Sequence, residues 1–333
     1  MEERKTNKKI NYSFELLRLI LALWVVFHHC CKNVCKFRGR FHIPTFMIMS
    51  FYFYYNTLKE QNIIKIKQRF QRISIPYIIW PTSTLIINNI LFKCLGFSQF
   101  NKNMHLKDLV LQLVFGFHYH NVFYYQFNLI IITMIFSIVS LLFAKYFTFI
   151  FQLFLILAYI FQYGNWSLYI LKKYSRIINY SLGNFFELLP FAVTGVTFHH
   201  LDVIPKLKNY KKLTIFFVIV VIFLILKYDI FTTIRGYYYP GIFLNIGGIC
   251  IFILFSLFSF KNKKIILFLK IITKFTGGIY YIHKNLYTIL RRKFTFLFNE
   301  TFHGSILIYL ICYIICYFGD KLTYKTKLKF LFN

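Results

Sequence analysis

Long apolar runs separated by short basic segments are the feature of this sequence that most restricts its fold. About ten runs approach the roughly 20 residues that a transmembrane helix needs. With approximate ends, they are residues 12–31, 42–58, 75–95, 123–143, 146–163, 184–201, 213–228, 238–260, 275–290 and 304–320. Charged residues make up only 15% of the chain, against about 25% in a soluble domain. The sequence therefore predicts an all-α fold, a polytopic membrane bundle of about ten transmembrane helices. We expect one integral-membrane domain over residues 1–333, with its helices within about 12–320 and no separate soluble domain.

Basic residues outnumber acidic residues by 40 to 10, which gives a net charge of +30. In a soluble protein this excess would suggest nucleic-acid binding. Here the Lys and Arg residues lie mainly between the apolar runs, as they do in membrane proteins. We therefore expect membrane lipids as partners and no nucleic acid. The segments on the side of the N-terminus carry more Lys and Arg than those on the other side, which predicts that both termini are cytoplasmic.

The stretch "HHCCKNVC" raises the possibility of a metal site. Imidazole and thiolate groups are good zinc ligands, but the spacing of this stretch matches no recognised site. Cysteines in helices are also common packing residues. We therefore expect no bound metal. The seven cysteines are odd in number and scattered along the chain, so they do not form a disulfide framework.

Arg18 and His29 stand out because ionisable side chains are costly inside a bilayer and usually line the interior of a bundle. They are eleven positions apart, which on an α-helix leaves them only about 20° apart around the axis and about 16 Å apart along it. Glu15 precedes Arg18 by three positions and can pair with it. One face of the predicted first helix therefore carries an acid, a base and an imidazole.

Passive roles for these residues stay open on this pattern alone. Arg18 could extend to the lipid headgroups with Glu15 as its partner, and His29 could lie at the outer interface without a function. For either residue alone the passive role is favoured, and their common face at two depths lowers that preference. Imidazole is also the most frequent general base near neutral pH.

Arg69 and Arg72 form a second cluster before the third apolar run. They are three positions apart, so on a helix they project from one side and could grip a phosphate group. The alternative is ordinary anchoring to the cytoplasmic leaflet. Glu187, inside the sixth run, is a further candidate for a buried acid, and it could pair with an arginine or with a histidine.

The first run, "FELLRLILALWVVFHH", resembles the opening helix of the membrane acyltransferase-3 family, multipass bacterial enzymes that O-acylate sugars. That family opens with an acidic residue three positions before an arginine, and with a histidine after ten further residues. Glu15, Arg18 and His29 fit this spacing, with Glu where Asp is usual. His28 does not fit it.

Two further segments resemble the family in the same order. "HIPTFMIMSFYFYY" is similar to its second helix, and it keeps Ser50 while Phe51 occupies a position where Gly is usual. "RFQRISIPYIIW" is similar to its Arg-x-x-Arg stretch before a proline, and it places Arg69, Arg72 and Pro76 on that pattern.

The resemblance extends into the second half of the chain, to about residue 290. "LLPFAVTGVTF" resembles a later helix of the family, with Pro190 and Gly195 in place. "FTGGIYYIHKNLY" is similar to a signature near its end, with Thr276 where Ser is usual. The matching residues of that signature are Gly278, Tyr280 and His283.

The resemblance implies an O-acetyltransferase that acts on carbohydrate hydroxyls, such as those of a polysaccharide, lipopolysaccharide or capsule. Family members take an acyl group, usually acetyl, from acyl-CoA on the cytoplasmic side of the bacterial inner membrane. They pass it to a glycan or glycolipid hydroxyl at the outer face. This implies acyl-CoA as a donor substrate and no permanently bound cofactor.

The same resemblance implies roles for the candidate residues. His29 would be the general base, with Glu15 as a second catalytic residue, and Arg18, Arg69 and Arg72 would bind the donor. Ser50, Tyr280 and His283 are candidates to stabilise the oxyanion. The alternative for Tyr280 and His283, which the sequence favours, is that they are packing residues with satisfied polar groups. Glu187 is a further candidate with no assigned role.

Two other classes of membrane protein remain as alternatives. A flippase or another transporter of lipid-linked glycans would also carry intramembrane charges and kinked helices. A glycan polymerase would also need arginines, usually in large external loops. The sequence has no very large external loop rich in arginine, and the ordered motifs favour acyl transfer.

Overall fold

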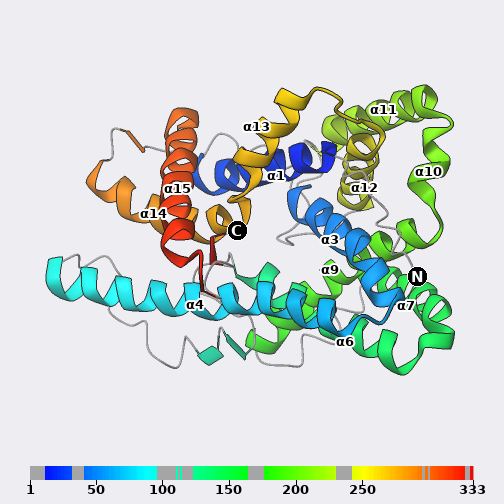
Figure 1. Ribbon diagram of the computed structural model, residues 1–333, viewed down its shortest axis with the longest axis horizontal. Helices are drawn as coiled ribbons and strands as arrows, with labels where there is room; N and C mark the ends of the chain where they lie inside the picture. Colours follow the sequence, from blue (N-terminus) through cyan, green and yellow to red (C-terminus); the bar gives the residue numbers. More distant parts are fainter. Residues whose placement is uncertain are drawn as a thin grey trace.

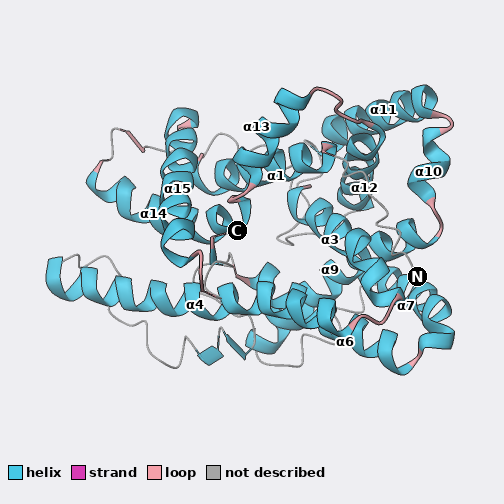
Figure 2. Ribbon diagram, in the orientation of Figure 1, coloured by secondary structure: helices cyan, strands magenta, loops and turns pink. Residues whose placement is uncertain are grey.

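A computed structural model describes the chain at the following residues: 12–31, 41–95, 110–111, 113–114, 123–163, 176–229, 242–294, 297–298, 301–326 and 331–332. In these segments every regular element is a helix, and no strand occurs among them (Figures 1 and 2). The all-α class predicted from the sequence is thus confirmed for the described residues.

The helices of the first half of the chain follow the predicted apolar runs, with some extensions. They are α1 (Ser13–Cys30), α3 (His42–Lys59), α4 (Ile63–Leu95), α6 (Tyr124–Leu142), the short 3₁₀ helix η1 (Ala144–Tyr146), α7 (Phe147–Tyr163) and α9 (Arg176–His200). α4 begins well before the predicted segment 75–95. The prediction counted only apolar residues, whereas the basic stretch with Arg69 and Arg72 is also helical and forms the first turns of α4.

The second half of the chain contributes six helices in its described segments. They are α10 (Val203–Lys208), α11 (Lys211–Asp229), α12 (Ile242–Leu257), α13 (Lys263–Thr273), α14 (Thr276–Lys293) and α15 (Phe302–Thr323). α13 and α14 meet at a bend of 45°. The first four residues of the predicted segment 238–260 lie outside the described part of the chain.

Three of the described helices are long and apolar enough to cross a membrane: α1, α6 and α15. A fourth span results if the bent pair α13–α14 is counted as one. Two shorter apolar segments are Ala144–Ile160, in η1 and α7, and Asn245–Leu257, in α12. The predicted number of about ten spans is therefore not confirmed and stays a prediction. Apolar length alone is a weak criterion here, because helices such as α4 mix apolar turns with charged ones.

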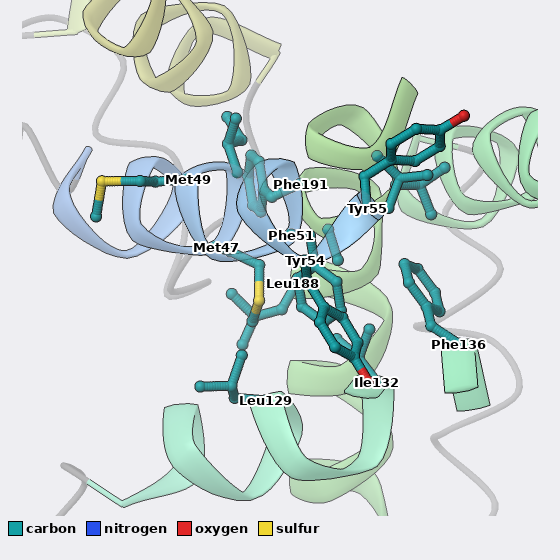
Figure 3. Close-up of a cluster of buried hydrophobic side chains, with 14 of the residues drawn as sticks. Met47, Met49, Phe51, Tyr54, Tyr55, Leu129, Ile132, Phe136, Leu188 and Phe191 are labelled. Carbon is teal, nitrogen blue, oxygen red and sulfur yellow. The ribbon is translucent and has the colours of Figure 1, made fainter. Parts of the chain in front are cut away.

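α3 lies at the centre of a large apolar cluster. It packs most extensively against α9, and side chains of α3, α6 and α9 meet there (Figure 3). Phe51, at the position where the resemblance leads us to expect glycine, is fully buried and packs edge-on against Phe136 at 4.9 Å between ring centroids.

The close approach of α3 and α9 depends on Gly195. A Cβ atom at this position would lie 2.3 Å from the carbonyl oxygen of Ile48 and 2.9 Å from the amide nitrogen of Tyr52. Both are backbone atoms, so a side chain here would force the two helices apart. Only glycine permits this crossing, which holds α3 in place against the rest of the cluster.

α1 joins this first cluster to a second one built from α13, α14 and α15. Phe14, Leu17 and Leu21 belong to the first cluster, whereas Leu19 and Val26 belong to the second. α1 contacts α3 and α12 on one side and α13, α14 and α15 on the other (Figure 1). The helix that carries Glu15, Arg18 and His29 is therefore enclosed by both halves of the described structure.

Candidate active site

Arg18 and Glu15 meet the bend between α13 and α14. Arg18 donates from Nε to Thr276 Oγ1 at 2.7 Å and from Nη2 to the Thr273 carbonyl oxygen at 2.9 Å. Its Nη1 lies 3.6 Å from Glu15 Oε2. The same carboxylate oxygen accepts a hydrogen bond of 2.8 Å from the Thr273 hydroxyl. These four groups form a closed network that ties α1 to the bend.

The network has a simple origin in helix chemistry. Thr273 is the last residue of α13, and carbonyl groups in the final turn of a helix have no partner within it. A guanidinium group satisfies such a carbonyl and also interacts favourably with the helix dipole. Since Arg18 uses two of its five N–H groups in hydrogen bonds, it keeps donors for an anion. Its side chain is about one-third exposed, at 34%.

Three turns further along α1, His29 meets α14 again. The ring centroids of His29 and His283 are 5.3 Å apart. His28 lies 5.4 Å from His29, and His42 of α3 lies 5.6 Å from His28. We call these four residues the histidine cluster. Arg18 and His29 both face α14, as their eleven-residue spacing predicts.

His283 is the most enclosed member of the histidine cluster. Its side chain has no exposed surface, and Nδ1 lies 3.1 Å from the carbonyl oxygen of Ile279 on its own helix. Tyr280 places its ring 6.2 Å from that of His283 and 6.0 Å from that of Tyr125 on α6. The predicted candidates His29, Tyr280 and His283 are therefore neighbours.

Arg69 and Ser50, two more predicted candidates, are also brought together. Arg69 donates from Nη2 to Ser50 Oγ at 2.8 Å, and its Nε lies 3.4 Å from Thr133 Oγ1 on α6. Its guanidinium carbon lies 4.1 Å from the ring centroid of Tyr54 and 5.1 Å from that of Phe51. Arg69 thus fastens α4 to α3 and α6 through hydrogen bonds and cation–π contacts.

Arg72 differs from Arg69 although the two are close on α4. Its side chain is exposed, whereas that of Arg69 is half-buried between helices. The predicted phosphate grip by both arginines therefore stays a prediction, and the structure separates the two environments. Glu187 lies half-buried in α9, three residues before Pro190, and its possible arginine or histidine partner stays open.

The sequence did not indicate several residues of these networks. Thr273 and Thr133 lie far from Arg18 and Arg69 in sequence, and a threonine in an apolar helix carries no signal of its own. His42 could have been noticed in the sequence, because a histidine at the start of an apolar run is expected to become a buried polar residue. In the structure it is 2% exposed. Among the described residues, no group of three or more His, Cys, Asp or Glu side chains could hold a metal ion.

Comparison with known proteins gives one match. A family model described as an acyltransferase domain matches residues 11–319, which is nearly the whole chain. No curated protein and no solved structure matches the chain.

Proposed function

The chain belongs to the acyltransferase-3 family, and we propose that it transfers an acyl group, most simply acetyl, from acyl-CoA to a hydroxyl of a cell-surface glycan or lipid-linked sugar. The observation that supports this best is the placement of two α1 residues. Arg18 and His29 both turn towards α14 in the interior, at two depths, with further polar groups beside each. A passive arginine or histidine would be expected to point towards headgroups or water.

In the proposed reaction His29 is the general base. A neutral imidazole nitrogen takes the proton of the sugar hydroxyl as the oxygen attacks the thioester carbonyl carbon. The resulting tetrahedral intermediate collapses with cleavage of the carbon–sulfur bond. The protonated His29 then returns the proton to the leaving thiolate, which leaves free CoA and the O-acylated sugar.

Arg18 is the proposed contact for a CoA phosphate, supported by its remaining donors and its partial exposure. Glu15 would hold the guanidinium in place together with Thr273. Arg72 is a second proposed phosphate contact, and its exposed side chain supports this role. For Arg69 we propose a supporting role, because its nitrogens already serve Ser50 and Thr133.

The remaining roles follow the same proposal. Ser50 and Tyr280 are candidates to donate hydrogen bonds to the oxyanion, and each hydroxyl carries one proton to donate. We place the protein in the inner membrane of a bacterium with both termini cytoplasmic. Acyl-CoA is then the donor substrate on that side, and no cofactor is bound permanently.

The decisive test measures acyl transfer directly. Purified protein in lipid nanodiscs is incubated with radiolabelled acetyl-CoA, and transfer or hydrolysis is followed. We expect His29→Ala and Arg18→Ala to lose activity at unchanged yield of folded protein. His303→Ala, which removes an exposed imidazole at the start of α15, is the matched control and should keep full activity. A fully active His29→Ala protein would contradict the proposed mechanism.

Mass spectrometry of surface glycans separates the proposed function from its rivals. Cells that lack the gene should lose one acyl mass from a glycan that cells with the gene carry. An unchanged acyl pattern together with accumulated lipid-linked precursor would instead indicate transport or polymerisation.

A further inference from the structure

We propose that His283 is a positioning residue for His29, and that it accepts a hydrogen bond from the His29 ring and thereby fixes which nitrogen acts as the base. This inference rests on the proposed function, in which His29 is the general base. The observations that support it concern the hydrogen bonding, burial and separation of the two rings.

The hydrogen bond of His283 to its own helix defines its tautomer. Nδ1 lies 3.1 Å from the Ile279 carbonyl oxygen, which can only accept. Nδ1 therefore carries the proton, and in a neutral imidazole Nε2 is then an acceptor. His283 can accept a hydrogen bond at Nε2 but cannot donate one there.

The acceptor nitrogen is buried without a partner. Nε2 of His283 has no hydrogen-bond partner among the described residues, and the whole side chain is 0% exposed. An unpaired buried acceptor costs free energy, so such an atom is usually paired in the working protein. A hydrogen bond to His283 Nε2 therefore requires an N–H or O–H donor nearby.

The His29 ring lies close enough to His283 to supply this donor. The ring planes of His29 and His283 are inclined by 37°, and their centroids are 5.3 Å apart. Since each ring nitrogen lies about 1 Å from its centroid, such rings can bring two nitrogens to about 3 Å by side-chain rotation, which is the length of a hydrogen bond.

The charges around His29 favour a neutral acceptor over a second cation. The titratable and charged groups that face His29 are His28 of α1, His42 of α3, and His283 and Lys284 of α14. Lys284 contributes a positive charge beside both rings. A second positive charge on His283 would be buried next to it, so the neutral tautomer with a free Nε2 is the stable one.

The pair then works as follows. One nitrogen of His29 donates its proton to His283 Nε2, and the other presents its lone pair to the sugar hydroxyl. When His29 takes the hydroxyl proton, the imidazolium keeps its hydrogen bond to His283, and that bond becomes charge-assisted and stronger. His283 thus orients the base in the resting state and stabilises it after proton transfer, without taking a proton itself.

Two amide substitutions that differ by one methylene group test this role. In His283→Asn the amide nitrogen can still donate to Ile279, but no acceptor remains at the Nε2 position. In His283→Gln the longer side chain restores an acceptor oxygen near that position. His200→Asn is the control, because His200 is a half-buried imidazole in α9 whose Nδ1 meets the Tyr55 hydroxyl at 2.8 Å.

We expect kcat to fall by about 100-fold in His283→Asn, which is the lower range for the loss of base catalysis. His283→Gln should stay within about tenfold of the natural protein, and KM for acetyl-CoA should change less than about threefold in both. His200→Asn should change neither value by more than about twofold. Size-exclusion profiles and melting curves of the purified proteins confirm that each variant is folded.

A normal kcat in His283→Asn alongside an inactive His29→Ala would overturn the positioning role and leave the proposed function intact. Equal losses of kcat in folded Asn and Gln variants would also overturn it, since the acceptor would then not matter. Full activity of His29→Ala would overturn both proposals, the role of His29 as general base and the role of His283 in positioning it.

Discussion

The crossing of α3 and α9 at Gly195 gives the sharpest prediction about stability, and the perturbation is Gly195→Ala. The new Cβ would lie 2.3 Å from the Ile48 carbonyl oxygen, whereas ordinary contact begins at 3.4 Å. The two helices must therefore separate by about 1 Å. Overpacking of this kind costs about 3 kcal/mol when backbone atoms have to move, and the better helix propensity of Ala returns about 1 kcal/mol. We expect a net loss of about 2 kcal/mol.

The loss of stability is measured as a decrease in the melting temperature of the purified protein in detergent or nanodiscs. For a chain of this size 2 kcal/mol corresponds to a decrease of roughly 4 °C. Activity should fall as well, because α3 carries Ser50 and a shift of about 1 Å would stretch its 2.8 Å bond to Arg69 beyond hydrogen-bond range.

The matched control is Gly183→Ala in the same helix. Gly183 is half-exposed, so its replacement should leave the melting temperature unchanged or raise it slightly. If Gly195→Ala were as stable and as active as the natural protein, the close crossing would not constrain the fold and the reasoning from Gly195 to Ser50 would be wrong.

Two further predictions address the arginines and their partners. Arg69→Ala should lower the melting temperature, because it removes the hydrogen bond to Ser50 and the cation–π contacts with Tyr54 and Phe51. Arg72→Ala should leave stability unchanged and raise KM for acetyl-CoA, since the Arg72 side chain is exposed. The reverse pattern would exclude the division of roles proposed above. Thr273→Val should cost about 1 kcal/mol of stability through loss of its bond to Glu15, and it should raise KM for acetyl-CoA while kcat changes little, as steady-state kinetics would show. An unchanged KM would mean that Glu15 does not help to hold Arg18 for the donor.

The sequence predicts best where helix geometry alone decides the outcome. The helical class follows from apolar length, and the common face of Arg18 and His29 follows from a turn of about 100° per residue. Both predictions are confirmed, because each depends only on the local geometry of one helix at a time. The family assignment also came from ordered motifs along the chain, and the match over residues 11–319 confirms it.

Contacts between distant helices could not be read from the pattern. Arg18 meets Thr273 and Thr276, more than 250 positions later, and no periodicity indicates this pairing. Arg69 and Arg72 look alike in the sequence, because their three-residue spacing puts both on one side of a helix. In the structure Arg69 lies between helices and Arg72 is exposed. The difference comes from where α3 and α6 pack, which the spacing does not indicate. The start of an apolar span is equally hidden from the pattern, since helices such as α4 join basic turns and apolar turns in one element.

The position of α1 between two apolar clusters has a consequence for how the protein is made. α1 is the first described helix to leave the ribosome, but three of its five main helix partners are α13, α14 and α15, at the other end of the chain. Until those helices are synthesised, Arg18 has only Glu15 as a partner within the described network. During most of translation one side of α1 therefore stays uncovered, until about the last fifth of the chain has been synthesised.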